Sequence, residues 1–434
     1  MRGGPFSRWW AAVPPVWIRL AGAQGQRNLR RLAGLALVAG FCALLVQLWH
    51  PVYHFTPLLQ VDRHNEPRLM PALRARPVAL NDGGYDGQYY AQLACDPTLR
   101  SPALPAAIDS LSYRARRILL PAVAWLLGFG DPGRAVAIYP WLNIACWLVL
   151  AGLLWSLLEV DQHWRGLLAW GGVMFSAGSL ASARYSLTDL PALLLLVLAV
   201  RAARGGREGW MAAWLGAGLL TRETMFAGAW GLCAQAWEWS VRWRRGVLWL
   251  ALAIVPYVVW MVYVRYRVGQ MSEGIGNFAM PFAGLVKYWR DSVGWLRSCP
   301  DPWLAWWSLL ALVGGTAQLL FVVSHVDVRD RWWRLGAGFA LLMLVLGHAV
   351  WEGYLGATTR VLLPLLLACN VMALRSRWAW GWLLLLNLSV PGGLADTLVR
   401  ADSRTFATAG PGRTRRRSAG CARGIWAAAP RSRP

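Results

Sequence analysis

The sequence predicts an all-α, polytopic transmembrane helix bundle of about 10–12 spans with a large first extracytoplasmic loop. Hydrophobic residues make up 57% of the 434 residues and charged residues only 15%, whereas a soluble domain carries about a quarter charged residues. The charge is missing from stretches long enough to cross a bilayer, for example 32–49, 135–158, 247–264 and 303–323. The arginines lie mostly between these stretches, where they set the topology of a membrane protein.

The formal net charge of +23 at first suggests a partner such as nucleic acid. Lys287 is the only lysine, so 43 of the 44 basic residues are arginine, which suggests a GC-rich coding bias. The sequence has neither zinc-finger spacing nor a basic helix with interleaved aromatic residues on a soluble domain. We therefore expect the lipid bilayer as a partner and no nucleic acid.

Arginine placement gives the expected topology, because short arginine-rich loops stay in the cytoplasm. Residues 1–31 form a basic cytoplasmic N-terminus, the stretch 32–49 exits, and 50–117 forms the large outer loop. The short apolar segment 118–129 is expected to be interfacial or re-entrant, and 135–158 returns to the cytoplasm. Further spans are expected at 166–183, 188–200, 210–220, 225–239, 247–264, 303–323, 335–350, 361–374 and 378–388.

The transmembrane domain is thus expected over 32–392, followed by a disordered tail over 393–434. The tail is rich in arginine, alanine, glycine and proline and shows no periodicity, most clearly after Ala401. The predicted register leaves this basic tail outside, against the positive-inside rule. Either one span is miscounted or the tail is not a native part of the fold.

Four outer turns carry ionisable and aromatic side chains, which are costly near a membrane and mark functional sites. The turns are far apart in the sequence, yet the predicted topology brings them to one membrane face. Their candidate residues are Asp82, Tyr85, Asp86, Gln88 and Tyr89 in the first turn, Arg184 and Asp189 in the second, Arg222 and Glu223 in the third, and Glu352 and Arg360 in the fourth.

Each candidate also has a structural interpretation. Asp86 could cap a helix by accepting the amide of Tyr89, and Asp189 could cap the helix that Pro191 begins. Arg222 and Glu223 could form a local ion pair between two short helices. Glu352 and Arg360 could be ordinary interfacial residues. The functional interpretation rests on the expected placement of all four turns at one membrane face.

Other motifs are weaker. His50 and His54 have the spacing of a metal-binding pair, with His64 beyond, but no acidic or cysteine ligand completes the set. The glycine motif at 274–279 has no strand–helix unit around it. Cys95 and Cys299 both fall in outer loops, so a disulfide between them is possible but weakly supported.

An acidic residue in a large first outer loop, followed by many short spans, resembles the GT-C superfamily of membrane glycosyltransferases. The motif Tyr85-Asp86-Gly87-Gln88-Tyr89-Tyr90, followed by Asp96-Pro97, narrows this resemblance. The resemblance is narrower to an uncharacterised bacterial family linked to cell-surface glycopolymer formation, and it covers roughly residues 30 to 390. The segments 116–121, 187–191 and 220–224 match later motifs of that family. It implies transfer of a hexose or pentose from a polyprenyl-phosphate-linked sugar to a glycan or lipid acceptor. The expected location is the outer face of the bacterial inner (cytoplasmic) membrane.

The residue chemistry is consistent with such a transfer, which needs a carboxylate to take a proton and cations to hold the departing phosphate. Asp86 is the expected base, with Asp82 and Asp189 as substitutes. Arginine forms bidentate bonds to phosphate oxygens. The expected substrate-binding residues are Arg184, Arg222 and Arg360 for the phosphate, Arg116 and Arg117 for the lipid head group, Tyr85 and Tyr89 for the sugar face, and Gln88 and Glu223.

Two alternatives stay open at this point. The chain could be a non-catalytic transporter or flippase of lipid-linked glycans, although charge along a path through the membrane would then be expected. It could also be an assembly protein that keeps the fold without the activity. The sequence does not decide whether a divalent metal is required.

Overall fold

A computed structural model gives the fold for residues 22–233, 242–269, 276–298, 302–351 and 357–402. The described chain is mostly helical, as the sequence predicts. Its one sheet in these ranges is a parallel pair of two-residue strands, β1 (Val61–Asp62) and β2 (Leu80–Asn81).

Four helices are long and apolar enough to cross a membrane. They are α3 (Ala23–Val46), α9 (Pro132–Leu157), α15 (Arg242–Val268) and α17 (Pro302–Ser324). A fifth span arises if α10 (Trp164–Met174) and α11 (Ala177–Arg184), bent by 46° between them, are counted as one. The described chain therefore supports four or five spans, fewer than the predicted 10–12.

Within the described residues, the other predicted spans form helices that are shorter than a bilayer requires. They are α12 (Asp189–Arg204), α13 (Glu208–Thr221), α14 (Phe226–Cys233), α18 (Arg331–Val345), α19 (His348–Trp351), α20 (Thr358–Val361), α21 (Leu363–Ala373) and α22 (Ala379–Leu386). Every residue of α21 is buried, so this helix is apolar all round because it packs inside the bundle. Hydropathy alone cannot distinguish such a core helix from a membrane span.

Two helices lie where the sequence predicts no regular structure. Helix α16 (Ala283–Ser298) occupies the outer segment 265–302 and packs on α17, α18 and α19. Helix α23 (Ser389–Asp402) continues past residue 393, where the disordered tail was expected to begin, and packs on α17 and α11. The predicted start of the disordered tail, at residue 393, is therefore too early in the chain. Packing on α17 and α11 gives this segment a helical structure despite its low apolar content. The remainder of the tail, 403–434, lies outside the described residues.

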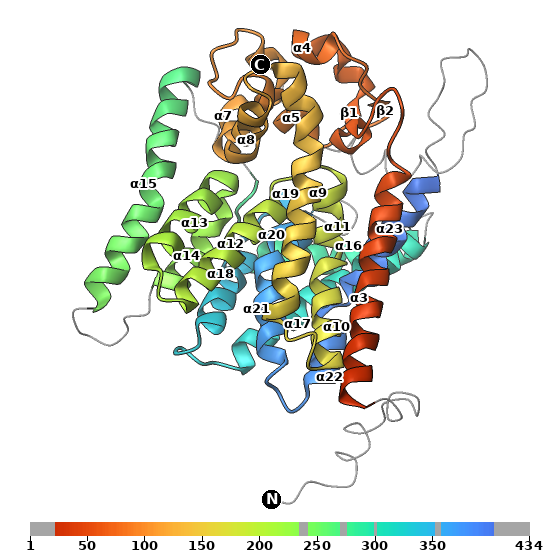
Figure 1. Ribbon diagram of the computed structural model, residues 1–434, viewed down its shortest axis with the longest axis vertical. Helices are drawn as coiled ribbons and strands as arrows, with labels where there is room; N and C mark the ends of the chain where they lie inside the picture. The colour runs from red at the N-terminus through yellow and green to blue at the C-terminus, as the bar shows by residue number, and fades with distance from the viewer. Residues whose placement is uncertain (1–21, 234–241, 270–275, 299–301, 352–356, 403–434) are drawn as a thin grey trace, which may run out of the picture.

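Residues 56–117 form a cap of short helices over one end of the bundle (Figure 1). The cap comprises η1 (Thr56–Leu59), η2 (Arg63–Arg68), α4 (Pro71–Arg74), α5 (Gly87–Cys95), α6 (Leu104–Ala107), α7 (Leu111–Arg114) and η3 (Ala115–Arg117). Leu59, Leu73, Tyr90, Leu93 and Leu104 belong to its hydrophobic core, which continues to α9. Helix α8 (Leu119–Leu127), next in the chain, is too short to span a bilayer, consistent with the expected interfacial segment.

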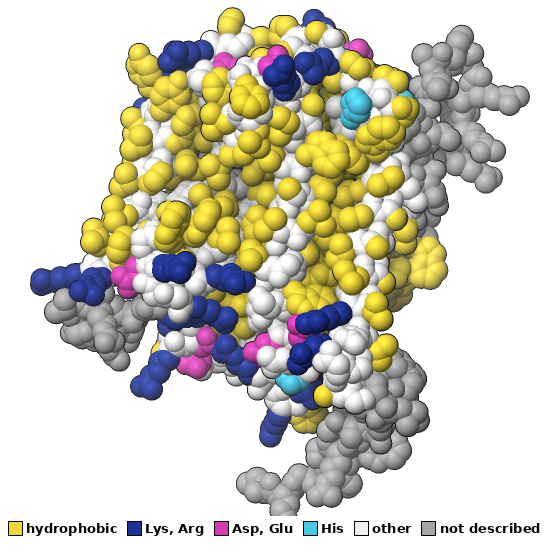
Figure 2. Space-filling model, in the orientation of Figure 1, with side chains coloured by type: hydrophobic (Ala, Val, Ile, Leu, Met, Phe, Trp, Pro, Cys, Tyr) yellow, Lys and Arg dark blue, Asp and Glu magenta, His cyan; other side chains and the backbone are white. Residues whose placement is uncertain are grey.

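The surface supports placement in a membrane. On the face seen in Figure 2, hydrophobic side chains form a broad band between the two ends of the bundle, and lysine and arginine side chains gather at those ends. Exposed apolar residues on α15, including Val255, Val259 and Val262, contribute to such a surface. A soluble protein does not normally expose so continuous an apolar surface. The predicted membrane protein class therefore agrees with the structure.

Candidate functional site

The cap and the bundle meet at the turn between α11 and α12. A Cβ atom on Gly87, the first residue of α5, would overlap the carbonyl oxygen of Tyr185. Glycine at this position thus allows the first turn of α5 to approach the bundle closely. Ser186, in the same turn, adopts φ of 50°, a left-handed conformation that is uncommon for a residue with a side chain. This turn places Asp189 at the start of α12, beneath the cap.

Asp189 lies between two arginines from distant parts of the chain. Arg222 Nη1 lies 2.7 Å from Asp189 Oδ1, and Arg360 Nη1 donates a hydrogen bond of 3.3 Å to Oδ2. The Asp189 side chain is only 1% exposed, and both guanidinium groups are buried. One buried carboxylate is therefore shared by two buried cations, and Arg360 also interacts electrostatically with Asp86.

Tyr85 connects the cap to this group. Its hydroxyl accepts a hydrogen bond of 2.8 Å from Arg360 Nη2, and its ring stacks on Tyr185 with centroids 4.7 Å apart. Burial raises the pKa of Tyr85 to about 12, with Arg360 acting in the opposite direction. Tyr85 is therefore a neutral hydroxyl that is fixed between the two parts of the site.

Asp86 belongs to a second ionic group, within the cap. Arg114 Nη1 lies 3.0 Å from Asp86 Oδ2, while Arg114 Nε and Nη2 donate to Asp109 at 3.0 and 2.8 Å. Burial disfavours the charged form of Asp86, but Arg114, Arg360 and Arg117 together hold the pKa of that carboxyl below its usual range. Asp86 is thus an ionised carboxylate, and its side chain is still 29% exposed.

These contacts differ from the capping and local-pair interpretations that the sequence also allowed. Asp86 precedes α5 without making a side-chain capping hydrogen bond. Asp189 lies within the first turn of α12 and pairs with arginines. Arg222 and Glu223 each bind a partner from another part of the chain, so they do not form the local pair considered above.

Glu223 instead binds Arg117 of the cap. Arg117 Nη2 and Nε donate to the two carboxylate oxygens at 2.6 and 2.9 Å, a bidentate geometry. The same guanidinium donates to the hydroxyls of Tyr90 and Tyr113 at 2.7 and 2.9 Å. Arg117 and Glu223 were expected to bind substrate, but here they join the cap to the segment after α13.

Arg184 is the last residue of α11, directly before the α11–α12 turn. Its Nη1 donates to the backbone oxygen of Asp396 on α23 at 3.0 Å, and its guanidinium lies 5.2 Å from the centre of the Tyr185 ring. The Arg184 Nε and Nη2 atoms are buried and have no hydrogen-bond partner in the described chain. The nearby hydroxyls of Ser186 and Thr188 are buried and unpartnered in the same sense. Buried donors of this kind can donate hydrogen bonds to an anionic ligand.

Three expected site residues lie apart from these groups. The Asp82 side chain is 91% exposed and is 3.8 Å from Arg63, because its loop turns to the surface. Gln88 Oε1 accepts the Asp62 amide at 3.2 Å, so this side chain stabilises the cap. Arg116 lies over the ring of Tyr113 at 5.6 Å. Glu352 and Cys299 fall outside the described residues.

The structure also adds residues that the sequence reasoning missed. Arg114 and Asp109 complete the ionic group of Asp86, Tyr185 supports Tyr85, and Asp396 holds Arg184. Arg114 precedes the motif at 116–121 by two residues, which is the one sequence signal that could have indicated it. The other contacts depend on long-range packing.

The combined site joins an ionised, partly exposed carboxylate to a buried cationic group, with Tyr89 alongside. The Tyr89 ring lies 4.9 Å from the Arg114 guanidinium and is half-buried. No group of three His, Cys, Asp or Glu side chains is placed to hold a metal ion in the described part of the chain. Comparison with known proteins finds no matching family model, curated protein or solved structure.

Proposed function

We propose that the protein is a membrane glycosyltransferase that moves a sugar from a polyprenyl-phosphate donor to a glycan or lipid acceptor of the cell envelope. The reaction would take place at the extracytoplasmic face of a bacterial inner membrane. The single observation that supports this most is the sharing of Asp189 by Arg222 and Arg360 beside the ionised Asp86. The first group offers positive charge to a phosphate, and the second offers a base to a hydroxyl.

The phosphate would bind beside the guanidinium groups of Arg222 and Arg360. Two guanidiniums share one carboxylate, and Arg222 Nε is buried without a hydrogen-bond partner in the described chain. A buried, unsatisfied donor costs roughly 1–3 kcal/mol, so a phosphate oxygen at this position would be favourable. In this role Asp189 orients the two arginines and does not act as a base, because both its oxygens already contact cations.

Asp86 would act on the acceptor. Its Oδ2 contacts Arg114, and its partial exposure leaves room for an acceptor hydroxyl to approach the carboxylate. As the acceptor oxygen bonds to the anomeric carbon, its proton passes to Asp86. The bond from that carbon to the phosphate oxygen breaks, and its electron pair leaves with the phosphate. A lowered pKa makes Asp86 a weak base, which suits a reaction whose leaving group needs little assistance.

Other residues fit supporting roles. Tyr89 is the aromatic residue best placed to contact a sugar, because Tyr85 is already engaged by Arg360 and Tyr185. Arg184 has unpartnered donors that suit a second oxygen of the phosphate. Arg117 and Glu223 would keep the cap in place over the bundle.

The test is transfer of a radiolabelled sugar from polyprenyl phosphate to endogenous acceptors in membranes that contain the protein. Arg222→Gln should lower transfer by about a hundredfold or more, the loss typical of removing a group that stabilises a developing anion. The matched control is Arg375→Gln, which breaks an exposed pair with Asp330 and should leave transfer unchanged. An Arg222→Gln variant that transfers sugar at the wild-type rate would contradict the proposal. Movement of the lipid-linked sugar across the bilayer without bond formation would instead favour a transporter.

A further inference from the structure

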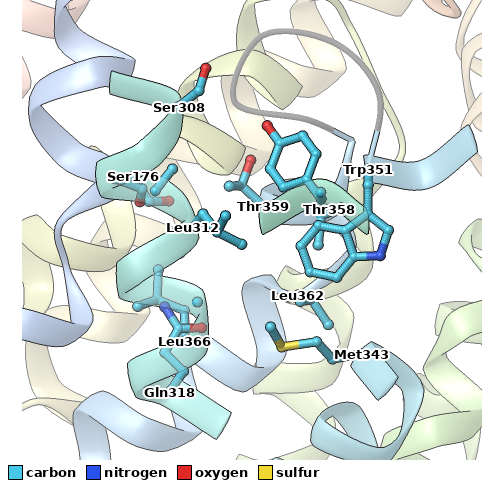
Figure 3. Close-up of a pocket in the computed structure, with 14 residues that line it drawn as sticks. Ser176, Ser308, Leu312, Gln318, Met343, Trp351, Thr358, Thr359, Leu362 and Leu366 are labelled. Atoms are coloured by element: carbon cyan, nitrogen blue, oxygen red, sulfur yellow. The ribbon is translucent and has the colours of Figure 1, made fainter. Parts of the chain in front are cut away.

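Polar side chains outside the candidate active site gather in two contrasting regions. The first is a pocket between α16, α17, α18 and α20, whose lining contains no Asp, Glu, Lys, Arg or His side chain (Figure 3). Water-sized molecules can occupy about 40 Å³ of it, which is room for only a few waters. The second region carries charge and lies at the end of the bundle away from the cap.

Three segments bring arginines together in this second region. Helix α12 starts beneath the cap, so its last residue, Arg204, lies at the opposite end of the bundle. The Arg204 guanidinium carbon is 5.7 Å from the centre of the Trp332 ring, in the first turn of α18. Arg331 directly precedes Trp332, and Arg375, just after α21, binds Asp330 at 2.8 Å. Residues of α12, α18 and the segment after α21 therefore meet at one place.

Arg204 and Arg331 differ from Arg375 in having no acidic partner. Among the residues that the structure describes, neither makes an ion pair, and Arg331 Nη1 is buried without a hydrogen-bond partner. Burial lowers the pKa of Arg204, and the charges of Arg331 and Arg375 lower it further. These charges act more strongly than Asp330 and Glu159, which have the opposite effect. The surroundings of Arg204 thus disfavour its charge, and a bound anion would relieve that repulsion.

The position of the two arginines indicates what kind of anion they meet. On the face seen in Figure 2, basic side chains border the hydrophobic band. Trp378 and Trp380, which follow Arg375 in the chain, are 53% and 40% exposed, and exposed tryptophans are typical of the headgroup level of a membrane. Lipid phosphates lie at that level, and a guanidinium forms bidentate hydrogen bonds to phosphate oxygens.

We propose that Arg204 and Arg331 bind the headgroup phosphate of an anionic phospholipid in the leaflet opposite the cap. The buried Trp332 ring holds the Arg204 guanidinium in place beside Arg331. A zwitterionic headgroup fits less well, because it brings an ammonium group close to the two cations. The inference does not depend on glycosyl transfer. Binding is measured without turnover, so failure of either proposal is distinguishable from failure of the other.

The experiment measures lipid binding to the purified full chain in detergent by native mass spectrometry. Phosphatidylglycerol should occupy a saturable site and bind about tenfold more tightly than phosphatidylethanolamine. Arg204→Gln and Arg331→Gln should each weaken phosphatidylglycerol binding by about fivefold to tenfold, because each removes a cation from the site. Inorganic phosphate should compete weakly, since it lacks the acyl chains that keep a lipid at the surface. Equally tight binding of inorganic phosphate, or of phosphatidylethanolamine, would overturn the proposal.

The matched control removes the same charge from the same end of the bundle. Arg377 is exposed, lies two residues after Arg375, and has its guanidinium 5.9 Å from the Trp378 ring. Arg377→Gln should leave the affinity within about twofold of wild type, because Arg377 lies outside the group around Trp332. An equal loss in Arg377→Gln and Arg204→Gln would mean that a basic surface attracts lipid without a defined site, and would overturn the proposal.

Thermal unfolding separates lipid binding from a structural role of Arg204. Without lipid, Arg204→Gln should unfold at the wild-type temperature or above it, because the change relieves repulsion from Arg331 and Arg375. With phosphatidylglycerol added, the variant should gain less thermal stability than wild type, since a ligand stabilises the state that binds it. A variant that is less stable without lipid but gains as much as wild type from phosphatidylglycerol would show a structural role and overturn the proposal.

Discussion

The two ends of the bundle form the same kind of ion pair in different surroundings. At the end away from the cap, Arg31 binds Asp161 at 2.8 Å with side chains that are 51% and 35% exposed. Under the cap, Arg222 lies 2.7 Å from Asp189, whose side chain is 1% exposed. An exposed pair contributes little because water solvates both charges well. A buried group that shares one carboxylate between two cations is costly to maintain, and such a cost is typical of a functional site.

The largest effect should follow removal of Asp189. Asp189→Ala leaves two buried guanidiniums without their shared carboxylate, so the free energy of unfolding should fall by about 3–5 kcal/mol. Asp189→Asn keeps the shape and should be nearly as destabilising, since the charge is what the arginines require. Unfolding of purified protein in detergent, followed by circular dichroism against denaturant, measures the change. If Asp189→Ala has the same free energy of unfolding as wild type, the shared carboxylate does not stabilise the fold as its burial suggests.

A smaller effect is expected where the cap contacts the bundle. Gly87→Ala introduces a methyl group against the Tyr185 carbonyl, and overpacking of this kind costs about 1–3 kcal/mol. The change should also lower transfer, because it moves Asp86 away from Arg360. Gly83→Ala is the matched control in the same loop, since no atom lies within 4 Å of its added Cβ. Equal behaviour of the two variants would show that the close approach is not required.

The pH dependence of protein stability should distinguish Asp86 from a carboxylate with an ordinary pKa. Its pKa is lower in the folded protein than in the unfolded chain, so the folded state favours the ionised form. The resulting stability is present above the unfolded pKa of about 3.9 and is lost as the pH falls through the lower folded value. Unfolding midpoints of wild type should therefore change little from pH 7 to 5 and decline below about pH 4. In Asp86→Asn the acid-side decline should be shallower, and an unchanged decline would contradict the assignment.

The smallest effect should come from the exposed pair. Asp161→Asn removes the partner of Arg31 and should change the free energy of unfolding by about 0–1 kcal/mol, with less effect at high salt. Arg31 lowers the pKa of Asp161 to about 2, but solvent screening limits what this contributes to stability. Denaturant titrations at low and high salt measure it. A loss as large as that of Asp189→Ala would remove the distinction between the two ends of the bundle.

The sequence predicts the helical membrane class well, because apolar stretches and arginine placement follow directly from the cost of charge in lipid. Of the 10–12 predicted spans, four or five are matched by described helices that are long and apolar enough to cross a membrane. Helix α21 is apolar because it is buried within the protein, and a hydropathy pattern does not distinguish burial in protein from burial in lipid. The interface between the cap and the bundle contains five of the expected site residues, namely Asp86, Tyr85, Asp189, Arg222 and Arg360. Their partners could not be assigned, since Arg114 and Tyr185 become neighbours of Asp86 and Tyr85 only through folding.

The central claim is that the ionic groups beneath the cap form a catalytic site in which Asp86 takes the acceptor proton. Asp86 and Asp109 both bind Arg114, so they form a matched pair that separates base catalysis from support of that arginine. The most direct measurement is the rate of sugar transfer from polyprenyl phosphate in membranes for Asp86→Asn and Asp109→Asn at equal protein levels. Transfer should fall by about 10²–10⁴ for Asp86→Asn and should stay near the wild-type rate for Asp109→Asn. Equal rates for the two variants, whether both high or both low, would contradict it.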